Sequence, residues 1–596
     1  MTLHIIDSSI IVIYLVAVVL MGFWLRRRAG AGMDAYFLGG RSIPWYVLGV
    51  SNASSMFDIA GTMWLVTMLF VYGLKGTWLP WLWPTFNQIF LMIYLAVWIR
   101  RSGVVTGAEW IGTRFGTGRG AELSRIAIVV FALISVISFL IYAYQGVGRF
   151  AAAFLPWDWT PDTYAMVLMG ITTFYVILGG MFSVVITDVF QFIMLTFASI
   201  FIAFIAMGNV APAALDAVIP EGWKHLFFGI SLDLDWSSLI PSVTEKIKAD
   251  GYNMFSIVWM MMLFKGILTS MAGTAPNYDM QRVLATRSPK ESAMMSGMVS
   301  AALIPRWLMI GGIAVLGLVF FSSELRNMEG AADFEMLMPF VIREFFPVGV
   351  TGLVIAGLLA AYMSTFDSTV NAGAAYLVND IYKRYIDPQA SERKVVWMSY
   401  SASVLIVIIG VIMGTQAESI HSAMGWIVTG LWGGFTIPNV LKWHWWRFNG
   451  YGYFWGMLSG IVTAMVLSQL VPASDYLYYF PVTMGVGAVG SILGSMLTDP
   501  DDMADLKSFY TTVKPWGFWG PVEAAVLVDD PEFKTGASAV RDLSNVAVGI
   551  IWQTSLVVAP VYLIIREWYA MGFAVALAVA TSYWLKTRWY DQMTND

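Results

Sequence analysis

The sequence predicts an all-α membrane protein with about 14–15 transmembrane helices. Of its 596 residues, 58% are hydrophobic and only 12% are charged, and the mean hydropathy is +0.69, a composition far from that of soluble domains. About 20 consecutive apolar residues cross a bilayer as a helix, and such stretches recur along the whole chain. The predicted spans are residues 8–25, 44–72, 80–99, 126–154, 163–181, 184–208, 253–275, 295–321, 345–378, 395–414, 421–441, 452–471, 479–497, 546–565 and 569–585.

The loops between these spans differ in their basic residues. Most of the 34 lysines and arginines fall in alternate loops, beginning with Arg26–Arg28 after the first span. Loops rich in Lys and Arg stay on the cytoplasmic side. The pattern predicts a multi-pass protein of the cell membrane with its N-terminus outside and its C-terminus in the cytoplasm. The first span lacks a small-residue cleavage site after its arginines, so we expect it to be retained as a helix.

Two predicted spans contain glycine and hydroxyl residues where a continuous helix would favour Leu or Ile. They are the stretch 49–62 in the second span and the stretch 266–277 in the seventh. Transporters often bind their cargo where two such breaks meet across inverted repeats, although small residues are also common in ordinary membrane helices. The expected units are an N-terminal extra helix with an inner loop (1–43), two five-helix repeats (44–208 and 253–442), and C-terminal extra helices (443–596) with an inner loop at 498–545.

The ninth span carries a stripe of small and hydroxyl-bearing residues. They recur every three or four positions and therefore share one helix face. Hydroxyls away from water need a partner, which is either a backbone carbonyl of the same helix or a ligand. Asp367 lies beside the stripe. Its members are Gly357, Ala361, Ser364, Thr365, Ser368 and Ala372.

Charged residues inside the predicted spans are functional candidates, because burying a charge in a membrane is costly. Asp58 lies in the first break, Lys265 precedes the second, and Arg306 lies within the eighth span. Two cations against one carboxylate leave a positive excess that could attract an anionic solute. The alternative is a structural ion pair with one cation reaching toward the interface.

The composition also excludes several classes of function. The chain has no cysteine and only four scattered histidines, which excludes thiol catalysis, disulfides and Cys-ligated zinc. Its net charge of −5 argues against nucleic-acid binding, and no nucleotide-binding motif occurs. We therefore expect neither an enzyme nor an ATP-driven pump, although missing motifs do not by themselves exclude a membrane enzyme.

Five segments of the chain carry a combined pattern, at residues 36–42, 106–116, 179–191, 281–285 and 364–382. Taken together and in this order, they resemble the sodium/solute symporter family, which includes the sodium/glucose, sodium/proline and sodium/sialic acid transporters. The resemblance implies a LeuT-like inverted-repeat fold, with ten core helices plus extra helices, and Na⁺ as the co-transported ion.

The same resemblance implies where sodium would bind. The site would lie between the broken second span and the ninth span, and backbone and hydroxyl oxygens suit a hard monovalent cation. A second sodium, present in some members, would fall at Asp188, Asp367 and Ser368. The ligands implied for the first sodium are the carbonyls of Val50, Ala53 and Ala361 and the hydroxyls of Ser364 and Thr365.

The solute cannot be named by this resemblance, because the polar residues of the family's sugar site are not preserved. Phe57 and Thr269 occupy two of those positions. Position and chemistry instead predict a solute-binding wall formed by Asn52, Ser55, Phe57, Asp58, Lys265, Thr269, Arg306 and Trp426.

The predicted function is a sodium-coupled secondary active symporter that imports a small polar organic solute by alternating access. The solute would be a sugar, a polyol or a carboxylate, and the partners would be this solute, Na⁺ and the lipid bilayer. Two alternatives stay open. One is a symporter-like solute sensor, and the other is a transporter coupled to protons through Asp58 or Asp188.

Overall fold

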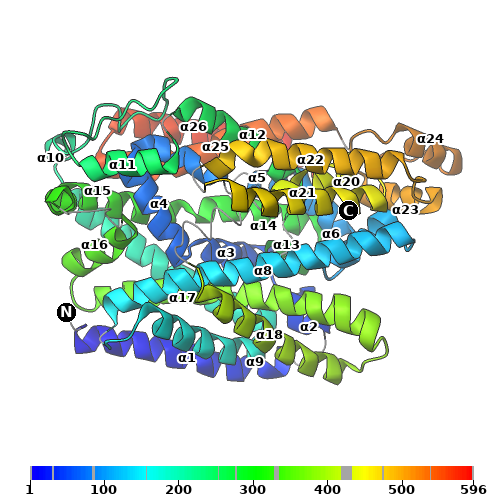
Figure 1. The fold of residues 1–596 in the computed structure, drawn as a ribbon, viewed down its shortest axis with the longest axis horizontal. Coiled ribbons are helices and arrows are strands. Elements are labelled where there is room, and N and C mark those ends of the chain that lie inside the picture. Colours follow the sequence, from blue (N-terminus) through cyan, green and yellow to red (C-terminus); the bar gives the residue numbers. More distant parts are fainter. Residues whose placement is uncertain are drawn as a thin grey trace.

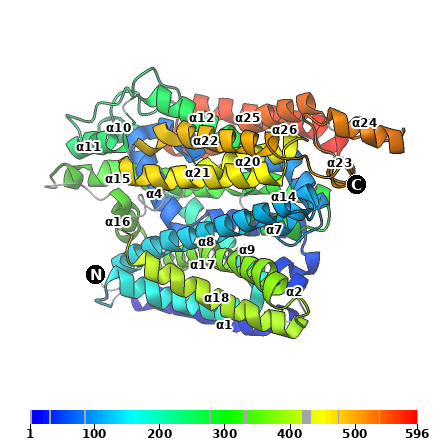
Figure 2. The ribbon, with the colours of Figure 1, turned by 45° about the vertical axis from the view of Figure 1, so that its right-hand side comes forward.

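In the computed structural model, long helices run side by side along the longest axis of the molecule (Figures 1 and 2). The two termini lie at opposite ends of this bundle (Figure 1). Which end faces the cytoplasm stays a prediction. The structure describes residues 3–29, 33–82, 87–155, 157–252, 254–274, 278–327, 334–417, 432–472, 475–536 and 538–593.

The first predicted repeat begins with a helix that breaks in its middle. Helix α3 ends at Met56, Phe57 leaves helical geometry with ψ of 35°, and extended Asp58 begins α4 as its N-cap. The break falls within the predicted stretch 49–62. The elements of this repeat are α3 (Trp45–Met56), α4 (Ile59–Tyr72), η2 (Gly73–Leu82), α5 (Asn87–Phe90), η3 (Leu91–Leu95), α6 (Ala96–Arg101), α7 (Gly107–Phe115), α8 (Arg119–Phe154) and α9 (Pro161–Asn209).

The second predicted repeat also begins with a helix that stops early. Helix α12 ends at Met271 and α13 begins at Tyr278, so the interruption overlaps the predicted stretch 266–277. The elements are α12 (Phe255–Met271), α13 (Tyr278–Ala285), α14 (Pro289–Ala302), α15 (Ile304–Asn327), η4 (Phe334–Met336), α16 (Leu337–Phe345), α17 (Val350–Ala375), η5 (Tyr376–Ile386), α18 (Glu392–Gly414) and α20 (Trp432–His444).

The other helices surround these two groups. Helix α1 packs against α9 and α17, and α25 packs against α15. The predicted loop at 498–545 contains two short helices, α23 and α24, at the end of the bundle opposite the N-terminus (Figure 1). The elements are α1 (Ile5–Ala29), α2 (Met33–Leu38), η1 (Gly39–Arg41), α10 (Pro212–Asp216), α11 (Pro241–Asp250), α21 (Gly450–Leu470), α22 (Tyr476–Met496), α23 (Met503–Val513), α24 (Gly520–Asp529), α25 (Ala539–Ile565), α26 (Trp568–Arg588) and η8 (Tyr590–Gln592).

Every predicted span overlaps helical structure, but the count of single long helices is lower. Among the described residues, ten helices are long and apolar enough to cross a membrane, or eleven if the bent pair α11–α12 is one span. The predicted spans 80–99 and 253–275 are broken into shorter pieces, the apolar part of the first span (Ile5–Met21) is short, and 421–441 lies partly outside the described residues. The predicted spans 163–181 and 184–208 also form one continuous helix, α9. The division into two repeats of five stays a prediction.

Helix α3 lies at the centre of the packing. It contacts α9, α14 and α17, so residues from both predicted repeats surround the break at Phe57 and Asp58. Close approach depends on glycine at one point, because a Cβ at Gly49 would lie 2.9 Å from the Met298 side chain of α14. The sequence around 49–62 therefore provides both the break and the tight packing on either side of it.

Candidate ion and solute site

The carboxylate of Asp58 organises the break between α3 and α4. Its Oδ2 accepts hydrogen bonds from the Gly61 backbone N–H at 2.9 Å and from the Tyr142 hydroxyl at 2.6 Å. Its Oδ1 pairs with Nη2 of Arg306 at 3.2 Å. A Cβ at Gly61 would lie 2.5 Å from Asp58 and 2.8 Å from Arg306, so glycine leaves the room in which the pair forms.

A cavity of about 130 Å³ lies beside this ion pair. Of the predicted solute residues, Ser55, Asp58 and Arg306 line it, and so does the predicted sodium ligand Thr365. Its wall also includes residues to which the sequence analysis assigned no role, from α3, α4, η2, α5, α8, α13, the junction of α14 and α15, α15 and α25. These are Met56, Gly61, Trp64, Leu65, Pro80, Asn87, Gln88, Phe139, Tyr142, Asp279, Leu303, Trp307 and Gln553.

Gln88 is the most informative of these additional residues. Its side chain is 3% exposed, and neither Nε2 nor Oε1 has a hydrogen-bond partner among the residues that the structure describes. A buried amide without partners costs free energy, and this amide borders a cavity. The signal in the sequence was the polar pair Asn87–Gln88 inside an apolar span.

The predicted sodium residues of α17 contact α3 at its last turn. The Ser364 hydroxyl lies 2.8 Å from the Ser55 hydroxyl, and the Thr365 hydroxyl donates to the Ser55 carbonyl at 2.6 Å. The Thr365 hydroxyl also lies 3.2 Å from the Ala361 carbonyl. The last carbonyls of a helix have no partner within it, so the break makes such oxygens available between α3 and α17.

The other two predicted ligands lie earlier on α3. Val50 precedes the break by about two turns, and the fully buried side chain of Ala53 packs against Val299 and Ala302 of α14. The hydrogen bonds described above join α3 to α17 through Ser55. Backbone and hydroxyl oxygens of the predicted type therefore meet here, while the full ligand set stays a prediction.

The predicted second sodium residues surround an arginine. Nη2 of Arg282, from α13, lies 3.1 Å from Asp188 Oδ2, 2.8 Å from Ser368 Oγ and 2.6 Å from Ser55 Oγ. The Ser51 hydroxyl donates to Asp188 and accepts from Arg282 Nε at 3.1 Å. The side chains of Arg282 and Asp188 are 1% and 0% exposed, so this network is shielded from bulk solvent.

Arg282 thus compensates the charge of Asp188 in the structure. The sequence analysis noted the segment 281–285 but gave Arg282 no role. The available signal was a basic residue directly after the second break, because a buried guanidinium requires several acceptors. The third residue of this set, Asp367, is fully buried on α17.

Four predicted solute residues lie outside the cavity lining, and the fifth cannot be placed. Asn52 hydrogen-bonds to Asp279, Phe57 is fully buried, and the Thr269 hydroxyl lies 3.2 Å from that of Thr436. The ammonium of Lys265 lies 5.4 Å from the ring centroid of Phe480 on α22. Trp426 lies outside the described residues.

Comparisons with known proteins agree with this architecture. A family model described as the sodium:solute symporter family matches residues 36–460. The sodium/glucose cotransporter 4 of Danio rerio is 26% identical over 507 residues, covering 78% of this chain and 72% of the relative. The sodium/glucose cotransporter of Vibrio parahaemolyticus is 25% identical, covering 86% of this chain and 94% of the relative.

Two further similarities broaden the range of solutes among the relatives. The sodium/proline symporter of Escherichia coli strain K12 is 24% identical and covers 83% of this chain and 94% of the relative. The solved substrate-bound, outward-open structure of a Na⁺-coupled sialic acid symporter has a TM-score of 0.66 at 17% identity. It covers 84% of this chain and 99% of that structure. This likeness shows that the two share a fold, in agreement with the predicted LeuT-like architecture.

Proposed function

The chain belongs to the sodium:solute symporter family, and from this premise we propose that it imports a small, neutral, polyhydroxylated solute together with Na⁺. Members of this family are multi-pass membrane transporters that use Na⁺ as the co-transported ion, and they are not enzymes. The choice of solute and the site residues are our proposal, and the geometry around the α3 break supports them.

The observation that carries the proposal is the sharing of two residues between the ion region and the cavity. Ser55 and Thr365 join α3 to α17 through the Thr365 hydrogen bond of 2.6 Å, and both also line the cavity. An ion that draws these two helices together would shape the solute cavity at the same time. Mutual dependence of the two affinities is the thermodynamic requirement for coupling.

The charges around the cavity favour a neutral solute over a carboxylate. Arg306 is already paired with Asp58, and Asp279 adds a second carboxylate to the lining. The positive excess inferred from the sequence is absent from this lining, because Lys265 contacts Phe480 instead. An anionic solute would therefore meet two carboxylates and one compensated arginine.

The remaining wall suits hydroxyl groups and the apolar face of a sugar ring. The amides of Asn87 and Gln88 offer donors and acceptors, and the indoles of Trp64 and Trp307 offer flat apolar surface. Binding sites commonly combine such apolar surface with a few polar groups that fix orientation. Hexoses and polyols are the solutes that match this combination.

Transport in proteoliposomes tests the proposal. An inward Na⁺ gradient should drive accumulation of a radiolabelled hexose or polyol, and a potential of 100 mV adds about 2.3 kcal/mol for each transferred charge. Proline and sialic acid serve as the competing solutes. Accumulation only of carboxylates would contradict the solute class. Binding without accumulation would indicate a sensor, and loss of uptake with a protonophore but not on Na⁺ removal would indicate proton coupling.

A further inference from the structure

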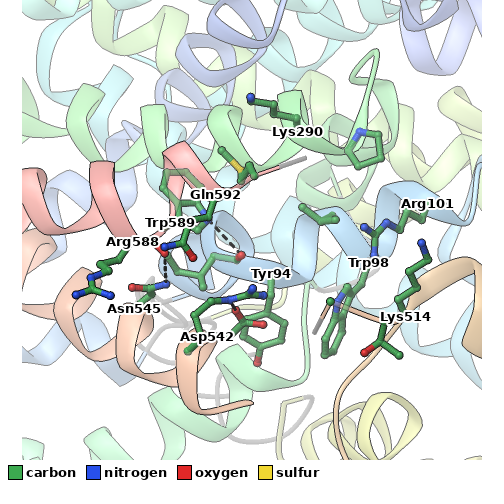
Figure 3. A pocket seen from close by; sticks show the side chains of 17 residues that line it. Tyr94, Trp98, Arg101, Lys290, Lys514, Asp542, Asn545, Arg588, Trp589 and Gln592 are labelled. Atoms are coloured by element: carbon green, nitrogen blue, oxygen red, sulfur yellow. Dashed lines mark hydrogen bonds and ion pairs between the residues drawn. The ribbon is translucent and has the colours of Figure 1, made fainter. Parts of the chain in front are cut away.

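A second and larger cavity lies away from the α3 break, where α6 and α26 end and α14 and α25 begin. Its volume is about 280 Å³, compared with about 130 Å³ beside Asp58. Figure 3 shows side chains from several separate segments around it. The proposed transport function uses none of these residues, so the cavity requires its own explanation.

The lining of this cavity is strongly basic. Among the described residues of the lining, the one acidic side chain is Asp542, which pairs with Nε of Arg541 at 3.0 Å. The other basic residues come from α6, the first turn of α14, the end of α23 and the last turn of α26. Figure 3 shows Arg101 and Lys514 on the right of the view and Lys290 apart from them at the top. The five basic residues of the lining are Arg101, Lys290, Lys514, Arg541 and Arg588.

Helix dipoles explain only some of these charges. Arg101 and Arg588 lie in the last turns of their helices, where a cation is favourable, and Arg101 also donates to the Val513 carbonyl at 2.8 Å. Lys290 and Arg541 lie in the first turns of α14 and α25, where a cation is unfavourable. Two helix N-termini and five basic side chains thus concentrate positive potential in one cavity.

We propose that this cavity binds a phosphate-bearing anion. Phosphate oxygens accept hydrogen bonds from Lys, Arg and the N–H groups of helix N-termini. The aromatic side chains of Tyr94, Trp98 and Trp589 and the amide of Asn545 complete the wall. A single inorganic phosphate would leave most of this volume and charge unused, so the ligand carries several phosphates or an organic group.

Two sources can supply this chemistry. One is the headgroup of an anionic phospholipid, since α25 and α26 are both long enough to cross the membrane. The other is a soluble polyphosphate such as a nucleotide. In either case the ligand would join α6 and α14 to the helices that follow residue 498, and α14 packs directly on α3.

The test measures the thermal stability of the purified full-length protein, because a ligand that binds the folded state raises its unfolding temperature. Potassium tripolyphosphate, added in neutral detergent, represents the soluble source. Nanodiscs of phosphatidylcholine with and without phosphatidic acid represent the lipid source. We expect a saturable rise with at least one probe, and the responding probe identifies the source.

Matched variants distinguish the cavity from general surface charge. Lys290→Gln/Lys514→Gln removes two cations of the lining and should raise the half-saturating concentration about ten-fold or more. Lys507→Gln/Lys586→Gln removes two cations that pair with Asp529 and Asp591 outside it and should bind like the unmodified protein. An equal loss in both double variants, or no rise with either probe, would overturn the proposal.

Folding of the cavity variant is checked separately. Lys290→Arg/Lys514→Arg keeps both charges and should retain binding, which separates loss of charge from loss of structure. If the neutral double variant does not fold, the single variant Lys290→Gln takes its place, with Lys586→Gln as its control. Retention of full affinity in Lys290→Gln would then count against the site.

Discussion

Two aspartate–arginine pairs connect the same two parts of the chain in different surroundings. Asp58–Arg306 has an N···O distance of 3.2 Å with side chains 14% and 12% exposed. Asp188–Arg282 has a distance of 3.1 Å, but its side chains are 0% and 1% exposed. In each pair the acid belongs to the first predicted repeat and the arginine to the second. The two N···O distances are nearly the same, so the pairs differ in how far their side chains are exposed to solvent.

That difference assigns the pairs different roles. The hydroxyls of Ser51, Ser55 and Ser368 surround the buried Asp188–Arg282 pair, and such a pair holds helices together. Asp58 and Arg306 border a cavity, where water or solute can replace a lost partner. Under the proposed function, the same residue types stabilise packing at one place and would face the solute at the other.

The largest expected effect is on stability, in Asp188→Asn. Removal of one partner of a buried ion pair leaves an uncompensated charge and typically costs about 3–5 kcal/mol. The unfolding temperature in detergent should fall strongly. Asp188→Asn/Arg282→Gln removes both charges and should recover part of the loss. If Asp188→Asn is as stable as the unmodified protein, the buried Asp188–Arg282 pair does not have the structural role that distinguishes it from Asp58–Arg306.

Asp58→Asn should affect transport far more than stability. A partly exposed ion pair contributes about 1 kcal/mol or less, while loss of a charge-assisted hydrogen bond to a solute reduces affinity about ten- to hundred-fold. Sodium-driven uptake measures the loss of solute affinity, and thermal unfolding measures the change in stability. Glu335→Gln breaks the pair with Arg149, which lies 3.1 Å away and outside the cavity, and should leave uptake intact. If Asp58→Asn binds the solute as tightly as the unmodified protein, Asp58 does not contact the solute.

The sequence predicted the fold and the α3 break better than the membership of the cavity. Glycine and hydroxyl residues at 49–62 indicated the break, since they are poor choices for a continuous apolar helix. Asp58 and Arg306 were recognisable because charges inside a membrane require a reason. The same argument selected Lys265, which contacts Phe480 instead. The free-energy cost of a charge within the membrane implies that the side chain has a partner, but it does not tell which neighbouring helix the side chain faces.

Other cavity residues were missed because they depend on how distant helices face one another. Tyr142 lies in the middle of α8, and Gln553 comes from α25, beyond the predicted repeats. No periodicity within either helix reveals that its polar residue faces α3. Arg282 was missed for a related reason, because its hydrogen bonds to Ser51, Ser55, Asp188 and Ser368 reach three separate helices.

Thr365→Ala should weaken sodium activation about ten-fold through loss of one hydroxyl between α3 and α17. The half-activating Na⁺ concentration for uptake measures the effect. Thr369→Ala is the matched control, because its hydroxyl lies one turn further along α17 and donates to the Thr365 carbonyl at 2.7 Å. Similar losses in the two variants would indicate a general effect on α17, and an unchanged Na⁺ dependence in Thr365→Ala would contradict the sodium site.

The smallest expected effect separates solute binding from stability most cleanly. Gln88→Leu removes an amide whose side-chain atoms have no partner among the described residues, so stability should hold or rise, because an unsatisfied buried amide is replaced by an apolar group of similar size. Solute affinity should fall about five- to ten-fold, measured by competition for uptake.

The control variant Gln145→Leu is the opposite case, since the Gln145 amide donates to the carbonyls of Gly414 and Ala417 at 3.0 and 2.9 Å. It should lower the unfolding temperature and leave solute affinity unchanged. If Gln88→Leu is the variant that unfolds more easily, its amide has a structural role and the cavity wall must be assigned differently.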